Sequence, residues 1–267
     1  MEKVLFSHQI YHFGRVSFQH LNIFNTRSKA RIPTDCAAAI AIIFPYYNKS
    51  ALGGNISAYC SLQDYHTVVM EQLNSICEEL SAKYPGHCFV PFVDSSPVDE
   101  VDMAVKAGLG VKGDNSLLIH PEFGSYVFIG EILTTLPLET TCCEDKGCLH
   151  CGRCNAACPG SAISRGKVDT GSCASHISQK KGELTEEERE ILSRANTVFG
   201  CDICQTVCPM NRKVEERENL FSGDIISTIT KENVENLYRI RPFGWRGLPV
   251  LKRNLDIYFN KEEKEGK

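Results

Sequence analysis

The sequence lacks several features that would assign the chain to a familiar class. It has no run of about 18 apolar residues, so we expect no membrane-spanning helix. Its start, MEKVLFSHQIYHFGR, has His and Gln where a secretory signal needs an apolar stretch. It also has no Walker motif, so the usual nucleotide loop is not evident. We therefore expect a cytoplasmic protein.

The sequence also lacks a strong excess of charge of either sign. Lys and Arg number 29, Asp and Glu number 33, and the formal net charge is -4. This balance predicts no nucleic-acid or membrane partner, although a local patch remains open. One stretch, residues 238–253, interleaves basic and aromatic residues, as in surfaces that contact an RNA backbone and stack on bases. Packing of the same stretch on the first domain explains it equally well.

Cysteine, in contrast, is abundant. The chain contains 14 cysteines, and ten of them fall between Cys142 and Cys208. In a long chain without an export signal, such clustering favours metal binding over disulfides. The remaining four are interpreted as small core residues: Cys36, Cys60, Cys77 and Cys88. Cys142 and Cys143 have no ligand spacing and stay unassigned.

The cysteine spacing predicts two [4Fe–4S] clusters. The segment CLHCGRCNAACPG has the pattern C-x2-C-x2-C-x3-C-P, in which the fourth thiolate binds the other cluster. The segment CDICQTVCP supplies three more ligands, and one intervening cysteine completes eight. Structural zinc and redox thiols are the alternatives, but zinc sites rarely show this spacing. By analogy with crossed ligation, one predicted set is Cys148, Cys151, Cys154 and Cys208, and the other is Cys158, Cys173, Cys201 and Cys204.

The rest of the chain reads as α+β. Residues 38–47, 88–94 and 126–135 are predicted strands, and apolar residues at helical spacing predict a helix between the first two. A second helix is predicted to start after Ser96, with Pro97 in the first helical position and Gly108 at its end. A third should begin at Thr185, where Glu188 completes a capping box. We divide the chain into an α/β domain over 1–138, a ferredoxin-like double-cluster domain over 139–215, and a basic segment and tail over 216–267.

Several segments resemble the epoxyqueuosine reductase family. They are VDSSPVDEVDMAVKAGLGVKGDNSLLIHPEFGSYVFIGEILTTL at 93–136, QDYHTVV at 63–69, the eight-cysteine arrangement, and FGCDICQTVCPMN. The resemblance covers about residues 36 to 211. It implies a nitroreductase-like corrinoid domain before the double-cluster domain, and cobalamin as a further cofactor. It also implies reduction of the epoxide of epoxyqueuosine, at the wobble position of certain tRNAs, to the alkene of queuosine, and a relation to corrinoid reductive dehalogenases.

The resemblance also assigns roles to residues. It places the family's proposed proton donor on Asp94, although the pattern alone favours a turn-capping role at the end of a strand. It makes Gly110 a candidate corrinoid contact, whereas the glycine spacing alone favours tight turns. Tyr126 and Glu131 are explained equally well by a plain strand, and His66 is read as a structural helix residue.

The chain departs from the family in three places. Val101 and Asp114 stand where members usually have basic residues, and the helical-repeat extension that helps bind tRNA does not follow. The substrate is therefore predicted to be tRNA or a smaller queuosine-related molecule, with a low-potential electron donor as partner and a monomeric state. The competing hypotheses are a corrinoid reductase of another small molecule and a non-catalytic ferredoxin-type electron-transfer protein.

Overall fold

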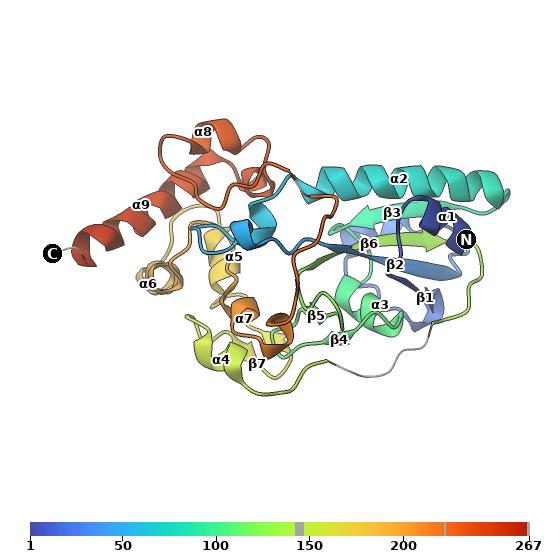
Figure 1. The fold of residues 1–267 in the computed structure, drawn as a ribbon, viewed down its shortest axis with the longest axis horizontal. Helices are drawn as coiled ribbons and strands as arrows, with labels where there is room; N and C mark the ends of the chain where they lie inside the picture. The colour runs from blue at the N-terminus through green and yellow to red at the C-terminus, as the bar shows by residue number, and fades with distance from the viewer. Residues whose placement is uncertain (142–146, 222, 266–267) are drawn as a thin grey trace. The chain divides into compact units, whose positions relative to one another are not determined.

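The computed structural model describes residues 1–141, 147–221 and 223–265, so Cys142 and Cys143 lie outside the described residues (Figure 1). The chain divides into two compact units. The first unit comprises Met1–Tyr46, Tyr65–Gly113 and Leu117–Cys148, and the second comprises Tyr47–Asp64, Asp114–Ser116 and Leu149–Lys267. The expected boundary near residue 138 differs from this division because residues 47–64 belong to the second unit. The basic segment 216–267 also belongs to that unit.

The first unit is built on a four-stranded sheet of order β1-β2-β6-β3. Its strands are β1 Phe13–Ser17, β2 Ala38–Pro45, β3 Phe89–Val93 and β6 Val127–Thr134. Every pairing in this sheet is antiparallel. The three predicted strands are confirmed as β2, β3 and β6. Strand β1 was not predicted, because FGRVS offers little apolar alternation.

Helices and smaller elements complete the first unit. They are α1 Glu2–Ser7, α2 Tyr65–Lys83, α3 Glu100–Lys106, the 3-10 helices η1 Phe18–His20 and η2 Thr26–Arg31, and a hairpin of β4 Val111–Lys112 with β5 Leu118–Ile119. The long predicted helix is confirmed as α2. The predicted start of α3 is wrong, because Asp99 caps the helix by accepting a hydrogen bond from the Asp102 backbone N at 3.0 Å. Pro97 therefore stays in the preceding loop.

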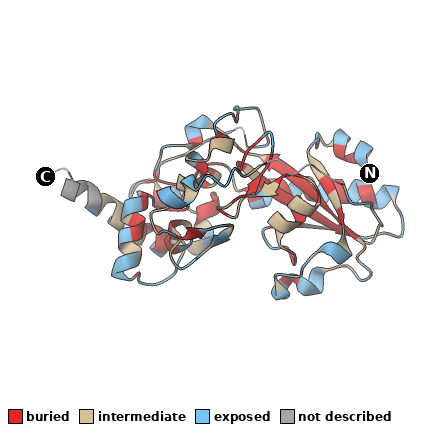
Figure 2. Cartoon of the chain, turned by 90° about the horizontal axis from the view of Figure 1, so that it is seen from below, coloured by how far each residue is buried: buried red, intermediate tan, exposed pale blue. Residues whose placement is uncertain are grey.

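The two faces of this sheet are covered by different helices. In Figure 1, α2 lies above the sheet and α3 lies below it. Because side chains alternate along a strand, Ile129 and Leu133 share one face of β6, and they belong to the buried cluster that contains Met103 of α3. The opposite face meets α2, where a Cβ on Gly130 would lie 3.2 Å from Leu73. Figure 2 shows the strands as predominantly buried.

The second unit consists of helices and one short hairpin around two apolar clusters. They are α4 Arg153–Ala157, α5 Ala174–Ser178, α6 Glu186–Ala195, α7 Ile203–Thr206, α8 Val234–Leu237, α9 Leu248–Glu265, a hairpin of β7 Ile163–Ser164 with β8 Lys167–Val168, and the 3-10 helices η3 Lys49–Ala51, η4 Ala58–Cys60, η5 Pro209–Asn211 and η6 Pro242–Arg246. The predicted capping box at α6 is confirmed by reciprocal hydrogen bonds between Thr185 and Glu188.

Asn55 fixes the segment 47–64 within the second unit. Its buried side chain donates to the Ile229 carbonyl at 2.7 Å and accepts from the Ile229 backbone N at 2.8 Å. Its own carbonyl accepts from the Val198 backbone N at 2.6 Å. One buried amide thus satisfies both backbone groups of a residue 174 positions away.

Replacing Asn55 tests this bridge. Asn55→Ala leaves both Ile229 backbone groups without their buried partners, which should destabilise the second unit by about 2–4 kcal/mol. The exposed Asn236→Ala is the matched control and should change stability by less than about 0.5 kcal/mol. Amide hydrogen exchange at Ile229 in the full chain measures the effect. Equal protection in both variants would contradict a structural role for the bridge.

Candidate functional site

Asp94 lies directly after β3 in a left-handed backbone conformation, with φ of 54°. Non-glycine residues adopt this region rarely, although Asp tolerates it better than most. The Asp94 side chain is 44% exposed. A polar side chain in this conformation at the end of a buried strand fits a functional position.

Two residues at the start of α2 contact the same carboxylate oxygen of Asp94. The Tyr65 hydroxyl donates a hydrogen bond to Oδ2, and Nε2 of His66 lies 3.0 Å from Oδ2. The Tyr65 ring stacks on Phe128 of β6 with centroids 4.1 Å apart, which fixes the hydroxyl. Because both contacts are made at Oδ2, the carboxyl is held in one orientation. The geometry suits a positioned acid or base.

Sequence reasoning missed the contacts that Tyr65 and His66 make with Asp94. His66 was read as a structural helix residue, yet its ring faces Asp94 and its side chain is 44% exposed. The available signal was QDYH, which lies among the matched segments and just before a helix. Helical periodicity gives no indication that this turn meets the end of a strand 28 residues later.

The loop after Asp94 is held by several further contacts. Arg31 donates to the Ser95 hydroxyl at 3.3 Å and to the Pro91 carbonyl at 3.3 Å. The Pro97 carbonyl accepts hydrogen bonds from the backbone N of Phe24 and of Asn25, at 2.8 and 3.0 Å. These contacts come from residues 24–31, far from Asp94 in the sequence. Tertiary contacts from a distant segment therefore help to position this loop.

Further carboxyl groups surround Asp94. Burial raises the pKa of Glu131 to about 8, and the charges of Asp94 and Asp99 raise it further against the Ser96 hydrogen bond. Burial also raises the pKa of Glu100, with additional effects of Asp94 and Glu131. Asp94 is thus the exposed member of an acidic group whose inner members favour the protonated form.

Gly110 is required by close packing within the chain. Its φ is 150°, and a Cβ at this position would lie 2.3 Å from the Ile119 carbonyl oxygen. Glycine is the residue that allows this approach between the segment after α3 and β5. The chain's own packing thus explains Gly110, and its role as a corrinoid contact stays a prediction.

The two departures from the family pattern have structural explanations. Val101 is partly buried and packs on the apolar cluster beneath the sheet. Asp114 is in hydrogen-bond contact with His150, with Oδ1 and Nδ1 2.9 Å apart. Neither position supplies a positive charge, so a contact with phosphate at these sites is not expected from this chain.

All four members of the second predicted ligand set belong to the second unit. Burial raises the pKa of Cys201 to about 11, and the charges of Asp202, Cys173 and Cys158 raise it further. Burial likewise raises the pKa of Cys204 to about 12, with Cys201 and Cys173 among the charges that raise it. Cys201 therefore lies close enough to Cys173 and Cys158, and Cys204 close enough to Cys201 and Cys173, for their charges to interact. Ligation of one iron–sulfur cluster by these four thiols stays a prediction.

The other predicted set is Cys148, Cys151, Cys154 and Cys208. Cys148 is the last residue of the first unit, whereas the other three belong to the second. Helix α4, which contains Cys154, packs against α7, which contains Cys204. The assignment of this set stays a prediction.

Asp202 fixes the backbone beside the second cysteine run. The Ser57 hydroxyl donates a hydrogen bond to Oδ1, and the Ala58 backbone N donates to Oδ2 at 2.6 Å. Burial raises the pKa of Asp202, and these two hydrogen bonds oppose the rise. The segment 47–64 therefore positions the backbone between Cys201 and the start of α7, which contains Cys204.

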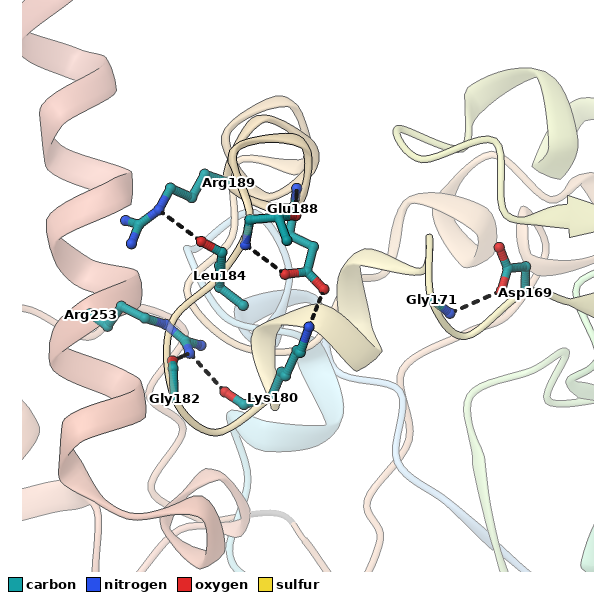
Figure 3. A network of polar contacts seen from close by, with 9 residues as sticks. Asp169, Gly171, Lys180, Gly182, Leu184, Glu188, Arg189 and Arg253 are labelled. Atoms are coloured by element: carbon teal, nitrogen blue, oxygen red, sulfur yellow. Dashed lines mark hydrogen bonds and ion pairs between the residues drawn. The ribbon is translucent and has the colours of Figure 1, made fainter.

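The basic C-terminal stretch mostly serves the structure of the second unit. Arg241 is buried, with an ion pair to Asp224 at 2.8 Å, and Phe243 is fully buried. Figure 3 shows Arg253 donating to the carbonyls of Lys180 and Gly182. Trp245 is 61% exposed and stacks on Arg246. Packing within the second unit thus accounts for much of the stretch that was a candidate RNA surface.

The site and fold define the class of protein, and comparisons support it. Residues 147–211 match the family model of the 4Fe-4S double cluster binding domain, so the chain is an iron–sulfur protein. Residues 29–95 match the model described as epoxyqueuosine reductase QueG, DUF1730. The epoxyqueuosine reductase of Lactococcus garvieae is 30% identical over 257 residues, covering 89% of this chain and 73% of that protein. The chain belongs to the epoxyqueuosine reductase family.

Further similar proteins agree with this assignment. The enzyme of Listeria monocytogenes is 41% identical over 205 residues, which are 73% of this chain and 54% of that protein. Two Bacillus relatives are covered to 61% of their length, so the chain spans little more than half of these relatives. The structure of the Streptococcus thermophilus enzyme matches with a TM-score of 0.83 and 23% identity, covering 97% of this chain and 80% of the other. The predicted fold class is confirmed. In addition, no helix in the described part of the chain is long and apolar enough to cross a membrane.

The ligand assignment leads to a prediction about iron content. After anaerobic reconstitution with iron and sulfide, Cys201→Ser should lose or convert one cluster, because its thiolate is one of four ligands. Cys60→Ser is the matched control, since Cys60 is a fully buried apolar-cluster residue of the same unit. Its iron content should equal that of the unsubstituted protein. Equal iron at full occupancy in both variants would overturn the assignment of Cys201.

Proposed function

We propose that this chain reduces the epoxide of epoxyqueuosine to the alkene of queuosine. The main support is the carboxyl of Asp94, which Tyr65 and His66 orient at the position where the family resemblance expects the proton donor. The same chain contains the double-cluster domain, which supplies electrons in reductive chemistry. An oriented acid and an electron source in one chain suit a reductase better than an electron carrier, because a carrier has no need of the acid.

The reaction sets the requirements for the site. Conversion of an epoxide to an alkene consumes two electrons and two protons, breaks both carbon–oxygen bonds and releases the oxygen as water. Asp94 delivers a proton to the departing oxygen. With Oδ2 engaged by Tyr65 and His66, Oδ1 is the oxygen proposed to donate this proton. His66, which is 44% exposed, connects Asp94 to solvent for reprotonation.

Cobalamin is proposed as the further cofactor on the basis of the family resemblance. When bound, it would supply the strongly reducing centre that opening an epoxide requires, with electrons from the two clusters. The residues of this chain are proposed to deliver a proton, through Asp94, and to ligate the iron–sulfur clusters, through cysteine thiols. The thiols of Cys158, Cys173, Cys201 and Cys204 would hold one of the clusters.

The proposed substrate is tRNA that carries epoxyqueuosine. One structurally similar epoxyqueuosine reductase has been solved with an epoxyqueuosine-modified tRNA stem loop. The free nucleoside is the smaller alternative, because much of the basic segment is engaged in internal contacts. We further propose a low-potential electron donor as partner and a monomeric state.

Conversion of modified tRNA tests the proposed function. The chain is reconstituted anaerobically with iron, sulfide and cobalamin, reduced by a low-potential donor, and supplied with tRNA or the free nucleoside. Mass spectrometry of the digested product should show loss of one oxygen. Asp94→Asn should slow conversion by at least about 100-fold, because it removes the proton donor while Asn tolerates the same backbone conformation.

Asp35→Asn is the matched control for this experiment. Asp35 is an exposed aspartate of the first unit with a similar φ of 60°, so its substitution should leave the rate within about 2-fold. Conversion of the nucleoside alone would identify the smaller substrate. Full clusters and bound cobalamin without conversion of either substrate would refute the proposed function.

A further inference from the structure

Glu131 is a carboxylic acid in an apolar sheet face. It lies on β6, the strand between β2 and β3, and its side chain has no solvent exposure. Its register partners are Ala41 and Phe92, and alternation places it on the face that packs against α3. A buried carboxyl among apolar groups is costly and calls for a specific reason.

The hydrogen bonding of Glu131 indicates a neutral acid. Oε2 accepts a hydrogen bond from the Ser96 hydroxyl, whose oxygen also accepts from the Val98 backbone N at 3.2 Å. Oε1 is buried without a hydrogen-bond partner in the described part of the chain. A carboxylate needs several donors or a cation when it is buried, and a single hydroxyl is insufficient.

The charges near Glu131 reinforce the neutral form. Asp94 and Asp99, from the loop between β3 and α3, both raise its pKa, and burial is the largest cause of a value of about 8. Glu100 at the start of α3 is a further carboxyl in the group. From the other elements, Tyr65 and His66 of α2 contact Asp94, and Arg31 of η2 contacts Ser95.

The loop 94–97 is held on both sides of the sheet. Asp94 contacts Tyr65 and His66 of α2, on one face, whereas Ser96 contacts Glu131, which points to the other. The two residues are separated by Ser95 alone, so a movement of Ser96 would displace Asp94. One similar enzyme, from Bacillus subtilis, has been solved with its catalytic aspartate loop swung out of the active site.

We propose that Glu131, as a neutral carboxylic acid, is a positioning residue that holds Asp94 in place through Ser96. This inference rests on the proposed role of Asp94 for its effect on activity, but its effect on the loop is independent of that role. Because the pKa of Glu131 is raised in the folded protein, the contribution of Glu131 to the stability of the loop 94–97 is complete below the ordinary pKa of Glu. It is lost as the pH rises through about 8.

Amide hydrogen exchange of residues 93–98 in the full chain tests the inference. After correction for intrinsic exchange, the unsubstituted protein should lose protection at Ser95, Ser96 and Val98 by about 10-fold between pH 7 and pH 9. In Glu131→Gln, the protection of these backbone amides should change by less than about 2-fold over this range, because the Gln side chain is neutral at both pH values and its oxygen still accepts from Ser96. In Glu131→Ala, the same backbone amides should be poorly protected at both pH values.

Thr134→Val is the matched control, because Thr134 is a fully buried polar residue of the same strand. It should retain the pH-dependent loss of protection. In the conversion assay, Glu131→Ala should lower kcat about 10-fold with little change in KM, and Glu131→Gln should restore kcat at pH 7.

Two results would overturn the inference. One is a pH-dependent loss of protection that persists unchanged in Glu131→Gln. The other is full protection of the loop in Glu131→Ala at pH 7. Because exchange is measured without substrate or cofactor, the expected exchange pattern without any conversion would refute the proposed function and leave the positioning role intact. If Glu131→Ala does not fold, the comparison of Glu131→Gln with the unsubstituted protein still decides the question.

Discussion

The pairing of β3 with β6 determines the arrangement around Asp94. The pair Val93 with Gly130 ends this ladder, so Asp94 emerges at a fixed point at the end of the sheet. A Cβ on Gly130 would lie 2.6 Å from the Phe44 ring and 3.2 Å from Leu73, so glycine permits the close approach of α2 to β6. This approach brings the first turn of α2, with Tyr65 and His66, to the Asp94 carboxyl. Strand register, a small residue and a helix start thus combine in one oriented acid.

The second unit depends on a different constraint, which is the placement of its cysteine thiols. Local sequence spacing accounts for only part of that placement. Short spacing positions cysteines within each run, but Cys158 and Cys201 become neighbours through tertiary structure. Asp202, held by Ser57 and Ala58, and the bridge from Asn55 to Ile229 tie distant segments to this region. In the sequence, residues 47–64 fall between two segments of the first unit, yet their contacts support the proposed cluster region of the second unit.

Much of this fold could be predicted from the sequence because its signals are local. The buried strands β2 and β6, the apolar face of α2 and the capping box at Thr185 each follow from spacing within a short window. The cysteine pattern is also local, and it indicated the double-cluster domain that the family model confirms. Strand β1 is short and weakly patterned, and the start of α3 was misplaced because Pro97 competes with the Asp99 cap.

Features that depend on tertiary structure were not predictable in this way. Alternation along β6 marks Glu131 only as a strand residue, and its Ser96 contact spans 35 positions. Arg241 looks like a surface cation in the sequence, yet it is buried beside Asp224 and the Ser61 carbonyl. In both cases residue type suggested one environment and packing supplied another.

The central claim is that Tyr65 acts through Asp94 by orienting its carboxyl for proton transfer. A double-mutant cycle measures this coupling directly, with single-turnover conversion of epoxyqueuosine by Tyr65→Phe, Asp94→Asn and the double variant. We predict that Tyr65→Phe slows conversion about 10-fold in the unsubstituted protein and less than about 2-fold in the Asp94→Asn background. Equal slowing in both backgrounds would show that Tyr65 acts independently of Asp94 and would contradict the account.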